Sequence, residues 1–178
     1  MIRNQKTKFD AAERGHTSIL AWYQTHLPEL LGQANLAGFT PVHNAAFHGQ
    51  TAVLAWYQEH FPQYIAPING TGATPVHYAA VAGHIAVLEW YQQYHPELLL
   101  QQDGQGAIAI HYAIEHNQVP VLTWFYQNHY PEALSQTDGD GFTPVHDAVQ
   151  HGQVDVLNWY QAHLPGLIVQ ATADGTTY

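Results

Sequence analysis

Apolar residues return along this chain in blocks about 34 residues long. The clearest marker of the period is tryptophan, which recurs as Trp22, Trp56, Trp90, Trp124 and Trp159. A histidine lies 13 residues before each of the last four tryptophans. Self-similarity at this period is typical of solenoids, whose units bury their apolar faces against one another. The sequence therefore predicts one all-helical domain, residues 1–178, with units at about 5–37, 38–71, 72–105, 106–140 and 141–174.

Residues 38–64, GFTPVHNAAFHGQTAVLAWYQEHFPQY, show the elements of one unit. Thr40 and Pro41 predict a helix start, because a hydroxyl caps a free N–H and proline needs no donor at the first position. Apolar residues at helical spacing continue to Gly49, which favours a helix end. A second helix with a broad apolar face follows and stops before Pro62. Each unit is thus predicted to be a turn, a short helix and a longer helix.

The motif at the first helix resembles the ankyrin repeat, whose pattern is T-P-L-H-x-A-A-x-x-G-H. It occurs as TPVHNAA from Thr40, as TPVHYAAVAGH from Thr74, and as TPVHDA from Thr143. The resemblance implies a solenoid of helix-turn-helix units joined by short β-turn or hairpin connections. It also implies that threonine and histidine tie each turn to the helix start, at Thr40, His43, Thr74, His77, His111, Thr143 and His146. The tryptophans replace family leucines, so a structural core role is expected for all five.

The chain departs from the family pattern at several places. A segment such as Pro-Glu-Leu-Leu, which begins at Pro28 and again at Pro96, adds one residue per unit and predicts a longer second helix or an extra helical turn. The fourth unit has Ile108 in place of the capping threonine and Asn117 in place of glycine, so we expect it to be the least stable. The first unit is polar, as the terminal unit of a solenoid should be. Gly175, Thr176 and Thr177 match the turn into a sixth unit, so we expect the chain to continue in a longer protein.

The charge distribution narrows the choice of partners. All four Lys and Arg residues lie within the first 14 positions, whereas the chain has 14 carboxylates and a formal net charge of −10. A surface without cations cannot neutralise phosphates, so nucleic acids and anionic membranes are not expected partners. A protein with a basic surface fits better. Cysteine is absent, and no apolar run is long enough to span a bilayer.

The 14 histidines do not predict a metal site. Most recur at fixed positions of the unit, and equivalent positions on stacked helices are about 8–10 Å apart, too far for ligands of one zinc ion. No nucleophile with a base, phosphate loop or carboxylate pair stands out either. We therefore expect no cofactor, no metal and no enzymatic activity.

The resemblance also implies where a partner binds. Ankyrin proteins generally bind proteins through their turn tips and the concave face of their first helices. Several aromatic residues map to these positions without a core role, and aromatic side chains are enriched in binding hot spots. The predicted partner-binding residues are Phe39, Asn44, Phe47, His48, Tyr78, Val81, Tyr112, Glu115, His116, Phe142, Asp147, Gln150 and His151.

The best interpretation is a monomeric protein–protein interaction scaffold in the cytoplasm. Two alternatives stay open. The domain could target a catalytic region beyond residue 178, as in bacterial effectors that act in a host-cell cytosol. It could instead be a pH-responsive scaffold, because its formal charge would change from −10 to +4 if all 14 histidines were protonated.

Overall fold

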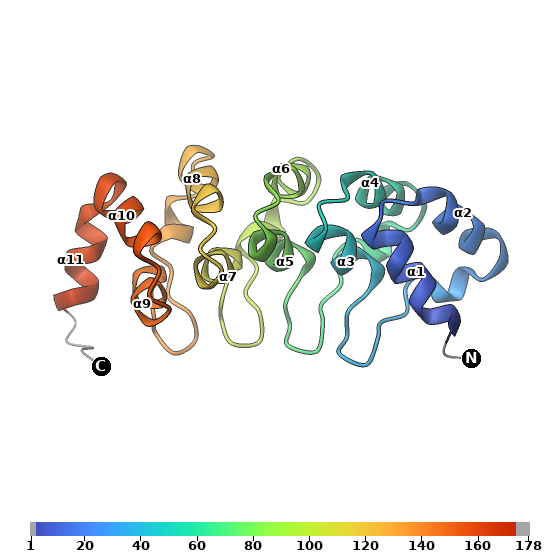
Figure 1. The fold of residues 1–178 in the computed structure, drawn as a ribbon, viewed down its shortest axis with the longest axis horizontal. Helices are drawn as coiled ribbons and strands as arrows, with labels where there is room; N and C mark the ends of the chain where they lie inside the picture. Colours follow the sequence, from blue (N-terminus) through green and yellow to red (C-terminus); the bar gives the residue numbers. More distant parts are fainter. Residues whose placement is uncertain (1–2, 174–178) are drawn as a thin grey trace.

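The computed structural model describes residues 3–173, and the side chains within 7–169 together with Ala171. The helices form pairs that stack into an elongated row, with four finger-shaped loops extending from one side (Figure 1). The predicted all-helical solenoid is confirmed, and the described residues contain no strand. From the first repeat to the fifth, the pairs are α1 (Arg3–Glu13) with α2 (Thr17–His26), α3 (Pro41–Phe47) with α4 (Thr51–His60), α5 (Pro75–Ala82) with α6 (Ile85–Tyr94), α7 (Ala109–Glu115) with α8 (Val119–Gln127), and α9 (Pro144–Gln150) with α10 (Val154–His163).

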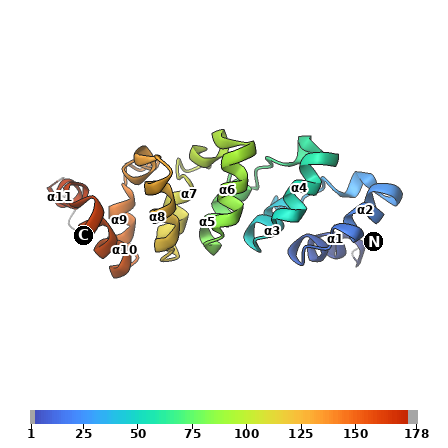
Figure 2. The same ribbon diagram turned by 90° about the horizontal axis from the view of Figure 1, so that it is seen from above.

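The first helix of each repeat packs on the first helix of the next, and the second helices form a separate layer (Figure 2). Small residues make close stacking of the first helices possible: Ala45, Ala46, Ala79 and Ala80 are fully buried. The second helices supply larger core side chains such as Leu54. The core is therefore a continuous strip that runs through all the repeats.

A left-handed residue separates the two helices of each pair. Gly83 ends α5 with φ 72°, a conformation that glycine adopts without steric cost. In the fourth repeat Asn117 takes the same place with φ 55°, and asparagine tolerates this region better than most residues. The fourth repeat also holds one more residue after its second helix, and His129 accommodates it at φ 63°.

The extra residues of the 34-residue unit form a short helical turn rather than a longer second helix. These 3₁₀ helices are η1 (Pro28–Leu30), η2 (Pro62–Tyr64), η3 (Pro96–Leu100) and η4 (Pro131–Leu134). At η1, η2 and η4, a buried tyrosine of the following repeat donates a hydrogen bond to a carbonyl at the end of the turn. The hydroxyl of Tyr57 donates to the Leu31 carbonyl at 3.1 Å, and Tyr91 and Tyr160 make the same bond at 3.0 Å to Ile65 and Leu134.

The fingers link neighbouring repeats through their backbones. They comprise residues 35–39, 69–73, 103–107 and 138–142, and each begins with Asn or Asp. The side-chain oxygen of that residue accepts N–H groups two and four positions later, as at Asp103 with Gln105 and Ala107. Successive fingers then bond to each other: Gly104 N–H donates to the Thr71 carbonyl at 2.9 Å. A Cβ at Gly72 would lie 2.6 Å from the Gly104 nitrogen, so this close approach requires glycine.

The prediction that all five tryptophans form the core is wrong in part. Trp22 is 50% exposed, Trp56 and Trp90 are half-buried, and only Trp124 and Trp159 are buried, each 6% exposed. The Trp159 ring lies against the preceding second helix, where its indole N–H donates to the Thr123 hydroxyl at 3.0 Å. Trp22 has no preceding second helix among the described residues. The most deeply buried aromatic is instead the residue after each tryptophan, and those residues are Tyr23, Tyr57, Tyr91, Phe125 and Tyr160.

The two ends of the row differ. In the first repeat Lys8 is fully buried, and its ammonium group donates to the carbonyls of Leu30 and Gln33; desolvation lowers its pKa to about 8. In the fifth repeat α11 (Pro165–Ala173) takes the place of the 3₁₀ turn. Val149 is 58% exposed, although Ala80 and Ile114 at the same repeat position are fully buried by the next repeat. The residues predicted to begin a sixth unit, 175–178, lie outside the described residues. No described helix has the length and apolarity needed to cross a bilayer.

Candidate partner-binding surface

The fingers and the first helices together form one surface, which we call the finger-side surface. Most of the predicted partner-binding residues lie on the first helices α3, α5, α7 and α9, and Phe39 and Phe142 end two of the fingers. All thirteen map to the fingers, the first helices or the residues that directly follow these helices. The second helices lie on the side of the row away from the finger tips (Figure 1). The role of the thirteen residues in binding stays a prediction, but their arrangement divides the surface into two chemically different parts.

The second to fourth repeats carry an aromatic row, defined as Phe39, Phe47, Tyr78 and Tyr112. The Tyr78 ring lies 4.7 Å from Phe39, 6.5 Å from Phe47 and 6.3 Å from Tyr112. The Tyr78 hydroxyl accepts a bond of 2.8 Å from Asn69, and the Tyr112 hydroxyl donates to Asp103 at 2.7 Å. The rings are therefore held in place by the fingers, while Phe47 remains 39% exposed. A rigid, partly exposed aromatic strip loses little entropy when a partner packs on it.

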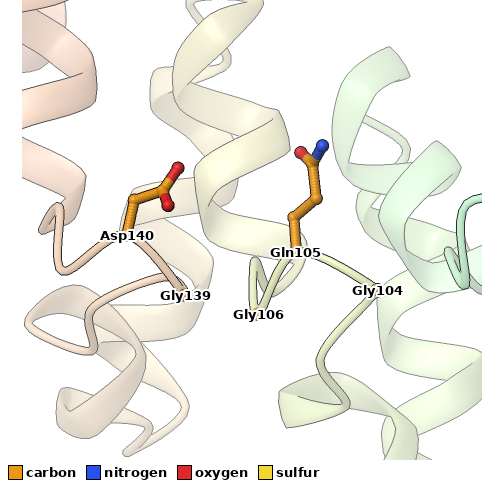
Figure 3. A pocket seen from close by; sticks show the side chains of 5 residues that line it. All are labelled: Gly104, Gln105, Gly106, Gly139 and Asp140. Atoms are coloured by element: carbon orange, nitrogen blue, oxygen red, sulfur yellow. The ribbon is translucent and has the colours of Figure 1, made fainter.

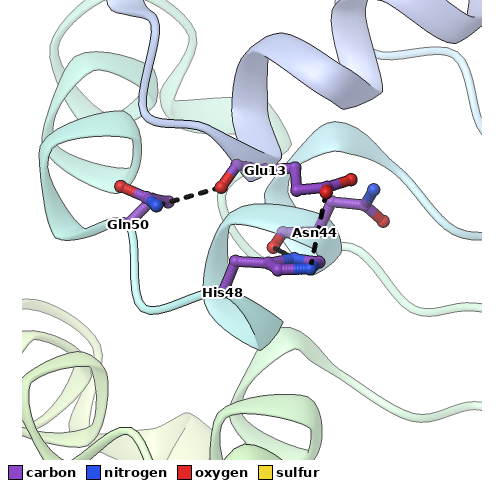
Figure 4. Close-up of polar contacts among 4 residues, drawn as sticks. All are labelled: Glu13, Asn44, His48 and Gln50. Carbon is purple, nitrogen blue, oxygen red and sulfur yellow. Dashed lines mark hydrogen bonds and ion pairs between the residues drawn. The ribbon is translucent and has the colours of Figure 1, made fainter.

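Polar contacts hold the N-terminal edge of this surface. His48 Nε2 lies 3.9 Å from the Glu13 carboxylate, and its Nδ1 is 2.9 Å from the Asn44 carbonyl (Figure 4). The Gln50 amide donates to the Glu13 carbonyl at 2.9 Å. The same glutamine bond recurs between later repeats, from Gln118 to Val81 and from Gln153 to Glu115. It serves to join neighbouring repeats.

The fourth and fifth repeats carry an acidic pocket, a cavity of about 210 Å³. Its walls come from two fingers and from α7 and α9. Five carboxylates line it, and these are Asp103, Glu115, Asp138, Asp140 and Asp147. An adjoining hollow of about 400 Å³ lies between the same two fingers, and Gln105 and Asp140 line both (Figure 3). The remaining lining of this hollow is glycine, so it presents mainly backbone.

Asp147 is the most unusual member of the acidic pocket. It is only 8% exposed, and no described group donates a hydrogen bond to its carboxylate. Desolvation, followed by the nearby charges of Asp138 and Glu115, raises its pKa to about 7, and His151 acts weakly in the opposite direction. A buried carboxylate is normally paired or bonded, so Asp147 is a site of unfavourable free energy in the isolated chain.

The capping histidines also differ between the two parts. His43 Nδ1 accepts from the Thr40 N–H at 3.1 Å, which places the proton on Nε2, and Nε2 donates to the Ala73 carbonyl at 3.2 Å. His77 has the same two bonds: its Nδ1 accepts from the Thr74 N–H, and its Nε2 donates to the Ala107 carbonyl. Burial is the main cause that lowers the pKa of both, to about 4 for His43. Both therefore stay neutral, as this bonding pattern requires.

In the fourth and fifth repeats this network is incomplete. The Nε2 atoms of His111 and His146 are buried without a hydrogen-bond partner. His111 keeps the bond from the Ile108 N–H at 3.2 Å, but Ile108 offers no hydroxyl, and the nearby Gln136 backbone lacks hydrogen-bond geometry to Nε2. His111 also lines the acidic pocket. Burial again lowers its pKa.

Sequence reasoning named some residues of the acidic pocket and missed others. It named Tyr112, Glu115 and Asp147, because they occupy first-helix positions. It did not name Asp103, Asp138 and Asp140, because these residues lie in the turns before the first helices and outside the positions that the family resemblance assigns to binding. The available signal was the first finger residue, which is neutral at Asn35 and Asn69 and acidic at Asp103 and Asp138.

Three other predicted residues do not belong to the lining of the acidic pocket. His116, Gln150 and His151 are exposed, and none of them lines the acidic pocket. His116 and His151 turn their Nδ1 atoms toward backbone carbonyls of their own helix, those of Tyr112 and Asp147. Among the described residues, no group of three or more His, Cys, Asp or Glu side chains is placed to hold a metal ion.

Comparison with known proteins agrees with this architecture. The family model described as ankyrin repeats (many copies) matches residues 76–126 and 110–159, which span most of the third, fourth and fifth repeats. Among curated proteins, none matches the chain. The second repeat has the same capping motif and helix pair as the matched ones. Residues 76–159 therefore belong to the ankyrin-repeat family.

Proposed function

We propose that this protein is a non-catalytic scaffold that binds a partner protein through its finger-side surface. Ankyrin repeats are in general protein–protein interaction modules, and this supports the class of function. The observation that supports the location is the pairing of two features on one surface. An aromatic row that is held rigid by the fingers lies beside an acidic pocket whose charges have no cation opposite them.

The partner we propose has an apolar segment next to a basic one. The aromatic row supplies anchors for the apolar segment. The acidic pocket favours a positive charge and disfavours nucleic acid and anionic lipid. We propose further that the scaffold acts as a monomer in the cytoplasm.

The experiment that tests this function compares variants of the two helix layers. Phe47→Ser and Tyr78→Ala together remove aromatic surface from the finger side. Tyr94→Ala and Tyr126→Ala are the matched control, because these tyrosines are 48% and 42% exposed on the second helices. Proteins captured from candidate cytosol by the unaltered chain and by the control, but lost with Phe47→Ser and Tyr78→Ala, would support the proposal. Loss with the control pair alone would place the interface on the second helices and contradict it.

The alternative of a pH-responsive scaffold is narrower than its composition implies. His43, His77 and His111 have lowered pKa values because they are buried, so each resists protonation in the folded chain more than a free histidine does. The full change from −10 to +4 is therefore not expected in the folded state. Partner affinity measured between pH 5 and 7.5 tests what remains of this alternative. The role as a targeting module for a catalytic region or as an effector stays a prediction.

A further inference from the structure

The acidic pocket concentrates negative charge that the chain does not neutralise. Five carboxylates line a cavity of about 210 Å³. From residue 15 onward the chain has no Lys or Arg, and its four basic residues belong to the first 14 positions. These basic residues lie in α1 or directly after it, at the opposite end of the row from the pocket (Figure 1). Residues 15–178 therefore offer this pocket no Lys or Arg side chain.

Two side chains in the pocket wall have a polar group without a hydrogen-bond partner, and only the His111 nitrogen is wholly shielded from solvent. The Asp147 carboxylate is 8% exposed and accepts no hydrogen bond from described groups. His111 is 2% exposed, and its Nε2 has no hydrogen-bond partner. Buried polar groups are bonded in the great majority of cases, and the Asp147 carboxylate is an acceptor that a cationic donor can complete. His111 Nδ1 accepts from the Ile108 N–H, which places the proton on Nε2, so this second nitrogen is a donor and does not itself favour a cation. The equivalents of Asp147 in the second and third repeats, Asn44 and Tyr78, are not charged.

The size of the pocket limits what can occupy it. Pockets for small molecules and cofactors generally measure about 300–1,000 Å³, so a cavity of about 210 Å³ fits one side chain better than a metabolite. A metal ion is a poor fit, because no group of three or more ligating side chains is in place among the described residues. The adjoining hollow is lined mainly by Gly104, Gly106 and Gly139, which lets a peptide backbone approach closely.

The chemistry of the wall favours arginine over lysine. A guanidinium group offers five donors in a planar fork, which suits several carboxylates better than a single ammonium group does. The planar group also stacks on aromatic rings. Tyr112 lines the pocket, and its ring is held by the hydroxyl bond to Asp103. A carboxylate wall with one fixed aromatic ring is therefore matched to guanidinium.

We propose that the acidic pocket binds one arginine side chain of the partner protein, an inference that rests on the proposed function. Asp147 is the central acceptor, and Asp140 and Glu115, both exposed at the mouth, guide the side chain in. The aromatic row then receives the apolar residues on one side of that arginine. The site defines the partner sequence as an arginine with an apolar segment next to it.

The test uses a probe that needs no partner. N-acetyl-arginine amide is titrated into the full chain while the carboxyl carbon of Asp147 and the amides of the fourth and fifth repeats are followed by NMR. N-acetyl-citrulline amide is the control probe, because it has the same shape without the charge. We expect saturable shifts with the arginine probe, at least about tenfold weaker binding of the citrulline probe, and a similar loss in Asp147→Asn.

Two further variants keep the result interpretable. Asp140→Asn removes a charge from the exposed rim of the pocket and should weaken the arginine probe severalfold without a change in folding. Glu89→Gln removes one charge from the exposed surface of α6, outside the pocket, and should leave the affinity unchanged. Equal weakening by Glu89→Gln would show a general charge effect and overturn the proposal. So would equal binding of both probes, or tighter binding of Ca²⁺ than of the arginine probe at these carboxylates.

The outcome separates this inference from the proposed function. Partner capture that needs Phe47 and Tyr78 but tolerates Asp147→Asn would leave the scaffold function in place and overturn the arginine site. Binding of the arginine probe that needs Asp147, with no capture through the finger side, would leave the pocket in place and overturn the scaffold function.

Discussion

The second and third repeats differ from the fourth and fifth in how they use the same structural positions. In the former, His43 and His77 make complete bonds to the cap and to the next finger, and the fingers begin with neutral Asn35 and Asn69. In the latter, the matching histidine Nε2 atoms are unpaired, and the fingers begin with acidic residues. One half of the row pairs both nitrogens of its capping histidines, while the other leaves one nitrogen of each unpaired and gathers five carboxylates in one pocket.

This difference shows how a repeat protein can divide stability and recognition between units. Each repeat contacts mainly its neighbours, so the free energy of the array is close to a sum of local terms. Unfavourable charges in the fourth and fifth repeats can then be offset by well-bonded repeats before them. The buried Trp124 and Trp159 add to this, since the tryptophans of the first three repeats are more exposed.

The largest expected effect tests the tryptophans of the two halves. Trp124→Ala removes a ring that is 6% exposed and should lower the free energy of unfolding by about 3–5 kcal/mol. Trp56→Ala removes a half-buried ring and should cost about 2 kcal/mol, because less apolar area leaves water at this position. Urea unfolding at pH 7.5 measures both. A larger loss for Trp56→Ala would reverse the comparison.

A second pair tests the capping histidines. His77→Ala removes two bonds to Thr74 and one to Ala107, and should cost about 2–3 kcal/mol. His111→Ala removes one bond, from Ile108, and an unpaired Nε2, so about 1 kcal/mol is expected. Urea unfolding of both variants at pH 7.5 gives the difference. Equal losses would show that the unpaired nitrogen is bonded in solution.

Acid should destabilise the well-bonded half first. His43 has a pKa of about 4 in the folded chain and about 6.5 unfolded, so above pH 6.5 it is neutral in both states. As the pH falls below 6.5, protons bind the unfolded chain first, and stability falls by about 1 kcal/mol for this histidine by pH 5.5. Hydrogen exchange of the α3 and α5 amides at pH 7.5 and 5.5 measures the change. Protection of these helices that is unchanged at pH 5.5 would contradict it.

The smallest expected effect is an increase in the free energy of unfolding, whereas the substitutions above lower it. The pKa of Asp147 is raised to about 7, so its destabilising influence develops between pH 4 and 7 and is complete above pH 7. Asp147→Asn should therefore raise the free energy of unfolding by about 1 kcal/mol at pH 8, and change it little at pH 4. Thermal unfolding at the two pH values measures this. Lower stability of the variant at pH 8 would show that the carboxylate has a favourable partner.

The unit, the helix pair and the capping residues could be predicted because they depend on local chemistry that the sequence repeats. The dipeptide Thr-Pro begins a helix at each of its three occurrences, residues 40–41, 74–75 and 143–144. Residues 83 and 117 follow the end of a helix and have a left-handed backbone. The degree of burial of each tryptophan could not be predicted. Trp22 and Trp159 share a position in the unit, but only Trp159 has a second helix before it to cover the ring.

The acidic pocket shows the same division most clearly. The sequence by itself determined the period, the all-helical architecture, the absence of cations after residue 14 and the family resemblance, because these depend on residue identity and spacing. The tertiary structure decided that carboxylates from residues 103 to 147 share one cavity and that Asp147 is buried there without a partner. Stacking sets the distance between side chains of different repeats, and that distance is not encoded in any single repeat.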